Sequence, residues 1–204
     1  MSKDPYKITV QGIGWIGEGD ATRTTEPHIY NRWKAMLSRV KGRPNHVSNE
    51  RYTNVTVCER WKNFQFFCED FKSMEHSGRE GFELDKDLTV PNSKIYSPET
   101  CAFVPKEVNS LLLTTNKIRG KHPVGVHEKN SKNKTFFCAG IRKWGVKKSI
   151  SLGSYDTPEL AFSAYKKAKE DYIKEVAERH FQKGNISEKI YNNLINWEIT
   201  EYPE

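Results

Sequence analysis

The sequence lacks several features that would assign it to a familiar class. Its four cysteines include no Cys-x-x-Cys pair and no closely following histidine, which argues against a zinc-binding motif and favours reduced cysteines of a cytosolic protein. No apolar run approaches the roughly 20 residues that a membrane helix needs, and the N-terminal stretch has no apolar signal-peptide core. Low-complexity segments and internal repeats are also missing. We therefore expect a soluble, cytoplasmic protein with no membrane partner.

A dinucleotide-binding motif is only formally present. Residues 12–17, GIGWIG, match the pattern G-x-G-x-x-G, but a dinucleotide fold needs a helix that opens at the third glycine. Here Glu18, Gly19, Asp20 and a threonine-rich loop follow instead. We interpret the glycines as a turn on a small hairpin and expect no nucleotide cofactor.

Composition favours two compact modules and an anionic partner. The chain has 204 residues, a net charge of +7 and 12% aromatic residues, so it is basic and still able to build cores. A polar, basic stretch at 114–123 indicates a linker. We expect a first module at 1–113, a second at 124–180, and a C-terminal helix and tail at 181–204. Such a basic excess is typical of polyanion-binding proteins, and a basic protein of no particular affinity is the alternative.

Two segments of the first module have apolar residues at helical spacing. Residues 28–40 form an amphipathic pattern, and residues 57–71 place Trp61, Phe64 and Phe67 on one face. Aromatic residues at this spacing are more often core than a stacking surface. We expect two helices that act as a scaffold.

Residues 81–113 predict a β-β-α unit. The pattern gives a strand at 81–88, a polar turn, a second strand at 94–96 and a helix that opens around Pro105. Proline is tolerated in the first helical turn because its missing N–H would have no partner there.

Three polar residues of this unit are candidate metal ligands. Asp85 and Asp87 lie two apart, so on a strand they point to the same face, and Asn109 lies one turn into the predicted helix. Two carboxylates and an amide oxygen can hold one Mg²⁺ or Mn²⁺, which can activate a water beside a phosphodiester. The alternative is an ordinary strand end with solvated charges.

Several motifs in and before this unit are shared with a known family. They are LDKDL and KIYSPETCAFVPKEVNSL, with GIGWIG, YNRWKAML and VCERWKNFQFF upstream. In these motifs the chain resembles phage-encoded HNH homing-endonuclease-like proteins. The resemblance implies catalytic positions at Asp85 and Asn109, which would bind the metal, at Lys86 in place of a general-base histidine, and at Thr100 near a middle asparagine. Lys86 and Thr100 depart from the family pattern, and a lysine base would need its pKa lowered from about 10.4 to near 7.

The second module predicts a three-stranded antiparallel sheet backed by one helix. Strands are expected at 124–127, 135–143 and 149–152. Thr157 is a strong N-cap candidate, and Pro158 suits the first helical position. Between residues 117 and 148, ten basic residues stand against a single acid, a balance that can neutralise several phosphates.

The stretches VGVHEK, AGIRKWG and SLGSYDTPELAFSAY carry a second resemblance, to the APETALA-two-type DNA-binding domain. It implies that the sheet enters the major groove of duplex DNA. The implied base-reading positions are His127, Lys129, Arg142, Ser149 and Ser151, and the neighbouring DNA-binding candidates are Lys143, Lys147 and Lys148. The planar fork of Arg142 matches O6 and N7 of guanine, and a phosphate contact is an equal alternative for it.

Together these patterns predict an α+β protein: N-terminal helices with a β-β-α metal unit, then a three-stranded sheet backed by one helix, and a C-terminal helix. We expect it to bind double-stranded DNA, with Mg²⁺- or Mn²⁺-dependent HNH-type cleavage of the phage homing type as the leading hypothesis. The alternative is a catalytically degenerate protein that only binds or masks its DNA site. The expected location is the cytoplasm of an infected bacterial host. The sequence leaves the target site and the oligomeric state open.

Overall fold

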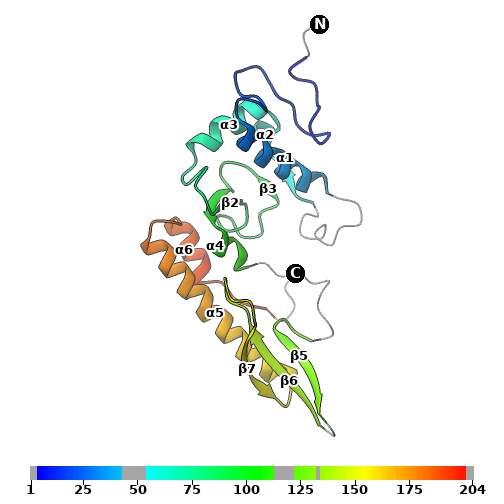
Figure 1. Ribbon diagram of the computed structural model, residues 1–204, viewed down its shortest axis with the longest axis vertical. Coiled ribbons are helices and arrows are strands. Elements are labelled where there is room, and N and C mark those ends of the chain that lie inside the picture. The colour runs from blue at the N-terminus through cyan, green and yellow to red at the C-terminus, as the bar shows by residue number, and fades with distance from the viewer. Residues whose placement is uncertain (1–3, 43–53, 113–121, 132–133, 201–204) are drawn as a thin grey trace. The chain divides into compact units, whose positions relative to one another are not determined.

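The structure, a computed structural model, describes residues 4–42, 54–112, 122–131 and 134–200 (Figure 1). It has a mixed α+β fold with several helices and a three-stranded antiparallel sheet. The chain divides into two compact units, unit 1 (Met1–Val104) and unit 2 (Pro105–Glu204). Of the predicted linker at 114–123, only its last two residues are among those described.

Unit 1 contains three helices near its N-terminus, α1 (Pro27–Lys41), α2 (Glu59–Lys62) and α3 (Phe64–Ser73). The helix expected at 28–40 is confirmed as α1, whose first turn holds Pro27. The single helix expected at 57–71 is wrong, because the chain breaks between α2 and α3. Asn63 stands at the break in an extended conformation, and its side chain accepts a hydrogen bond from the Gln65 backbone N–H, which makes it the N-cap of α3.

Large aromatic side chains form the core of unit 1, as the sequence predicted. Trp33, Trp61, Phe64 and Phe67 are at most 1% exposed. The indole N–H of Trp33 donates to the backbone oxygen of Trp61 at 2.7 Å. The buried N–H group therefore has a hydrogen-bond partner. The glycines of the formal nucleotide motif form a tight turn, in which Val10 and Gly14 make an isolated antiparallel bridge.

The short strands of unit 1 pair differently from the predicted hairpin. β2 (Phe82–Asp85) pairs with β4 (Ala102–Pro105), whereas β3 (Ile95–Tyr96) pairs in parallel with β1 (Thr56–Val57). The segments 81–88 and 94–96 therefore belong to separate sheets, and β2 ends at Asp85. The expected helix begins directly after Pro105 as α4 (Lys106–Ser110), which belongs to unit 2.

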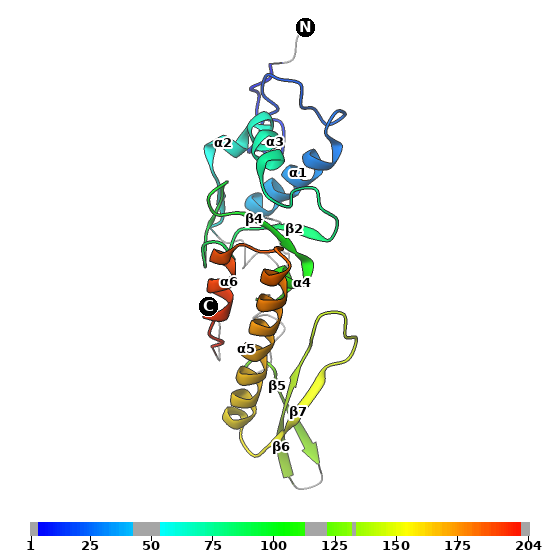
Figure 2. The same ribbon diagram turned by 90° about the vertical axis from the view of Figure 1, so that its left-hand side faces the viewer.

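Unit 2 contains the expected sheet and its helix. β5 (Val126–Ser131), β6 (Lys134–Ile141) and β7 (Ile150–Tyr155) form an antiparallel sheet in chain order, and α5 (Pro158–Gln182) runs along it (Figure 2). The hydroxyl of Thr157 accepts the Leu160 N–H, so the predicted N-cap is confirmed. The expected C-terminal helix is α6 (Glu188–Ile195), which packs beside α5.

Close packing between the sheet and α5 depends on a glycine. A Cβ atom on Gly125 would lie 2.0 Å from Cδ2 of Tyr165, and Gly125 also has a φ of +76°, which favours glycine. Ala139 on β6 and Ala161 on α5 are also buried. Among the described residues, no helix is both long enough and apolar enough to cross a membrane.

Candidate nucleic-acid interface

The sheet of unit 2 has one face against α5 and one face turned away from it. The register places His127 opposite Cys138, and Lys129 opposite Phe136, while Val126 lies opposite the buried Ala139. Because side chains alternate along a strand, the face turned away from α5 carries the following residues: His127, Lys129, Ser131, Lys134, Phe136, Cys138, Gly140, Arg142, Ser149, Ser151 and Ser154. We call this surface the open face. All five base-reading positions implied by the sequence lie on it.

The described residues that form the open face include no aspartate or glutamate, but Lys134 on that face pairs at 2.8 Å with Asp156, which directly follows β7. Glu128, the acid of β5, lies on the opposite face, where it contacts His122 at 2.9 Å. Some cations of α5 are neutralised, as in the pairs Lys166–Glu170 and Lys167–Asp171. The open face is therefore basic around Lys129 and Arg142 and is neutralised at Lys134.

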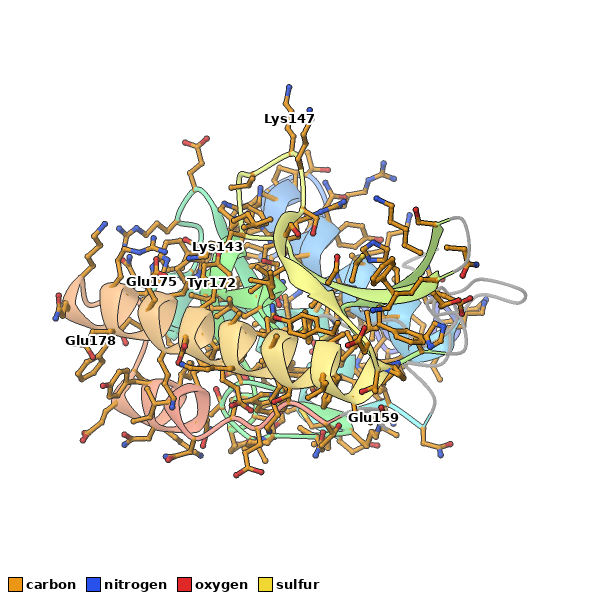
Figure 3. All side chains as sticks on the ribbon, turned by 90° about the horizontal axis from the view of Figure 1, so that it is seen from below. Lys143, Lys147, Glu159, Tyr172, Glu175 and Glu178 are labelled. Carbon is orange, nitrogen blue, oxygen red and sulfur yellow. The ribbon has the colours of Figure 1, made fainter. Side chains whose placement is uncertain are left out.

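Four of the candidate cations make no ion pair with any described residue. They are Lys129, Arg142, Lys147 and Lys148, and all four are exposed. Figure 3 shows Lys147 extending from the turn between β6 and β7, away from α5. Lys143 differs, because its ammonium pairs with Glu175 at 3.0 Å and lies over the ring of Tyr172. The structure thus places Lys143 toward α5 rather than on the open face.

Two serines, one just before β7 and one within it, are positioned by contacts to β6. The hydroxyl of Ser149 donates to the backbone oxygen of Ile141 at 3.3 Å, and Ser154 lies 3.3 Å from the thiol of Cys138. Ser151 is exposed and has no such contact among the described residues. Its hydroxyl can donate or accept, so it is the serine of the open face best able to contact a base edge.

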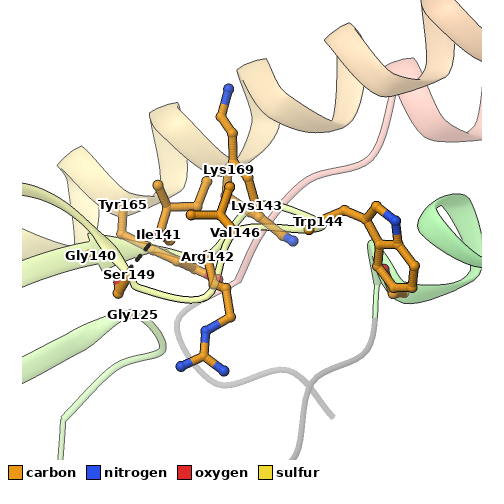
Figure 4. Close-up of a pocket in the computed structure, with 12 residues that line it drawn as sticks. Gly125, Gly140, Ile141, Arg142, Lys143, Trp144, Val146, Ser149, Tyr165 and Lys169 are labelled. Atoms are coloured by element: carbon orange, nitrogen blue, oxygen red, sulfur yellow. Dashed lines mark hydrogen bonds between the residues drawn. The ribbon is translucent and has the colours of Figure 1, made fainter.

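A cavity of about 460 Å³ lies beside the turn between β6 and β7 (Figure 4). Its lining comes from both sheet and helix and includes Gly125, Ile141, Arg142, Trp144, Tyr165 and Lys169. Lys169 makes no ion pair with a described residue, and burial lowers its pKa. Sequence patterns did not single out Lys169, because a lysine within a helix that has several other lysines carries no distinguishing pattern.

The turn is fixed to α5 by a network that sequence reasoning missed. Tyr172 Oη accepts the backbone N–H of Trp144 at 2.9 Å and donates to Glu107 at 3.2 Å. Glu107 also accepts two hydrogen bonds from the guanidinium of Arg179, at 2.9 and 3.0 Å, and lies 3.1 Å from His180 Nε2. The hydrogen bonds from Arg179 are the main reason that the pKa of Glu107 falls to about 2. This network ties α4, α5 and the turn together.

The candidate metal ligands of unit 1 are engaged with the chain itself. Asp85 Oδ1 accepts the backbone N–H groups of Asp87 and Leu88, each at 2.8 Å. Burial raises the pKa of Asp85, which opposes the charged form that a cation would need. Lys86 is 5% exposed, lies 2.5 Å from Asp87 Oδ1, and donates to the backbone oxygen of Ser93.

Asp85 and Lys86 are thus held by contacts within the chain, and the metal site stays a prediction. The Asp87 carboxylate already has a counter-charge in Lys86. Within the part of the chain that the structure describes, no three His, Cys, Asp or Glu side chains group in a way that could hold a metal ion. Thr100 takes a structural role, because its hydroxyl donates to the backbone oxygen of Ile95 at 2.7 Å.

Comparison of the chain with protein-family models, with curated proteins and with solved structures gives no match. The two resemblances noted in the sequence therefore stay predictions.

Proposed function

We propose that the protein binds double-stranded DNA through the open face of the β5–β6–β7 sheet. The observation that carries this proposal is the distribution of charge: Lys129, Arg142, Lys147 and Lys148 have no acidic partner among the described residues, whereas Lys134 on the same face is neutralised by Asp156. A surface of this kind attracts a polyanion, because each cation that meets a phosphate releases a condensed counterion.

The shape of the sheet supports duplex DNA as the polyanion. A major groove about 12 Å wide admits strands, and several DNA-binding proteins read it with a sheet. The open face combines cations with groups that can contact base edges, namely His127, Arg142 and Ser151. In this proposal Lys129, Lys147 and Lys148 contact phosphates, and Arg142 contacts a guanine.

In unit 1, Lys86 and Asp87 already contact other groups of the chain. This favours DNA binding without cleavage over the nuclease hypothesis. Lys86 is held by Asp87 and Ser93, so it is not free to take a proton from water. The role that this supports is occupation or masking of a DNA site. HNH-type cleavage rests on the resemblance and on the sequence pattern of Asp85, Asp87 and Asn109.

Salt dependence of duplex binding tests the proposal. If three lysines contact phosphates, the logarithm of the affinity should fall with the logarithm of salt concentration with a slope of about −3, at roughly 0.9 per phosphate. Lys147→Ala should reduce that slope by about 1, and Arg142→Ala should relax the preference at one base position. The control is Lys167→Ala, which removes an equally charged residue that is paired on α5. A flat salt response, or equal losses in Lys147→Ala and Lys167→Ala, would refute the proposed surface.

A further inference from the structure

The turn between β6 and β7 exposes an unusual amount of apolar surface. Trp144 is 52% exposed, Val146 42% and Ile150 41%, and all three lie within seven residues of chain. Large apolar groups that gather on a basic surface mark a contact site more often than isolated ones do. Figure 4 shows Trp144 at the far end of the turn, directed away from Arg142.

This exposed group is held in a fixed position. The Val146 N–H donates to the Lys143 oxygen at 3.2 Å, and Gly145 has a φ of +74°, which together indicate a type II turn with Trp144 at its corner. The Trp144 backbone N–H is bound by Tyr172 of α5, and Lys143 is bound by Glu175. The indole is therefore presented by a backbone that two anchors on α5 hold in place.

Cations stand on both sides of the indole in the chain. Arg142 precedes it, and Lys147 and Lys148 follow it, without an ion pair to any described residue. The turn continues directly from the open face, because Arg142 and Ser149 belong to that face. A duplex that contacts the open face would thus also meet the turn.

The chemistry of DNA limits what an indole can contact there. Phosphates and sugars are polar, and the edges of base pairs in the grooves are polar apart from the thymine methyl group. The large apolar surfaces of DNA are the faces of the bases, which become accessible when a base step opens. Phosphates on either side of an opened step would lie within reach of the flanking cations.

We propose that Trp144, with Val146 beside it, inserts between adjacent base pairs at the edge of the bound site and kinks the duplex. This inference rests on the proposed DNA binding and specifies how the protein would deform its site. Apolar side chains inserted from the minor groove kink DNA by roughly 20–90°, and we expect a kink of the same order here.

A DNA-bending assay on a selected binding site tests whether Trp144 acts as a wedge between base pairs. The full-length protein is first used to select its preferred duplex from a random pool, and that site is then placed at the centre or at the end of otherwise identical fragments. The wild-type complex should migrate more slowly with the central site. Trp144→Ala should abolish this difference and bind on the order of 10-fold more weakly. The salt slope should stay unchanged, because no phosphate contact is lost.

Two features keep the assay decisive. Alanine at position 144 retains the backbone N–H bound by Tyr172, so the turn keeps its anchor. Leu160→Ala is the matched control, because Leu160 is 56% exposed on α5, and it should leave bending and affinity unchanged. DNA binding by the wild type without bending would overturn the wedge and leave the proposed function standing. A loss of affinity on replacing thymine by deoxyuridine, again without bending, would assign Trp144 to a methyl contact and also overturn it. Absence of any duplex binding would overturn both.

Discussion

The carboxylate of Glu107 should stabilise unit 2 more than any exposed ion pair on α5 does. Its partners are Arg179, His180 and Tyr172, and its side chain is only 14% exposed. Glu107→Gln keeps the size of the side chain but removes the charge that Arg179 binds through two hydrogen bonds. The variant should therefore loosen the attachment of α4 to α5.

The pKa of Glu107 sets the magnitude of this effect. It lies at about 2 instead of the ordinary 4.5, and each unit corresponds to about 1.4 kcal/mol, which gives about 3 kcal/mol in favour of the folded state at neutral pH. Because the folded pKa is depressed, the stabilisation is complete above pH 4.5 and disappears as the pH falls toward 2. At pH 3 less than half of it should remain. Against a typical domain stability of about 5–15 kcal/mol, this is a large contribution.

Urea unfolding of the full chain measures this contribution, with α5 followed by pulsed hydrogen exchange. Glu107→Gln should lower the free energy of unfolding by about 3 kcal/mol at pH 7 and by clearly less at pH 3. The control is Asp171→Asn, which breaks the solvent-exposed pair with Lys167 and should change stability much less. Equal stability of Glu107→Gln and the wild type at pH 7, or a difference that does not shrink in acid, would refute the reasoning.

Two further predictions concern unit 1 and the packing of unit 2. Supercoiled DNA incubated with the protein and Mg²⁺ or Mn²⁺ should be bound but not cut, as judged on agarose gels; metal-dependent nicking that disappears in Asp85→Ala would establish the nuclease instead. Gly125→Ala should destabilise unit 2 by about 3 kcal/mol, because its Cβ would overlap Tyr165 and its φ is positive. Gly145→Ala has a positive φ but open surroundings, so it should cost only about 1 kcal/mol in the same unfolding experiment. Similar losses in the two glycine variants would contradict the packing argument.

Local patterns predicted much of unit 2 and part of unit 1. The cap at Thr157, the start of α5 at Pro158 and the aromatic core around Trp61 all follow from short-range rules, and the structure agrees with each. The break at Asn63 was missed because the apolar periodicity runs on from Trp61 to Phe64 across it. A cap inside a continuous apolar stripe is visible only as one polar residue.

Pairing between distant segments accounts for most of what the sequence could not predict. β2 and β3 are consecutive in the chain, yet each pairs with a strand from elsewhere, and strand patterns carry no information on the partner. The network around Glu107 joins residues more than 60 positions apart. The exposure of Trp144 was missed for a related reason, since the sequence shows a tryptophan in a turn but not whether the turn covers it.

The bond between Glu107 and Arg179 also bears on the order in which the protein folds during synthesis. The two residues are separated by 72 positions, which at about 5–20 residues per second corresponds to roughly 4–14 s of translation. For that interval the Glu107 carboxylate has been synthesised but the guanidinium that neutralises it does not yet exist. Unit 2 can therefore close only after nearly all of α5 has been made, and the completion of α5 becomes the step on which its assembly waits.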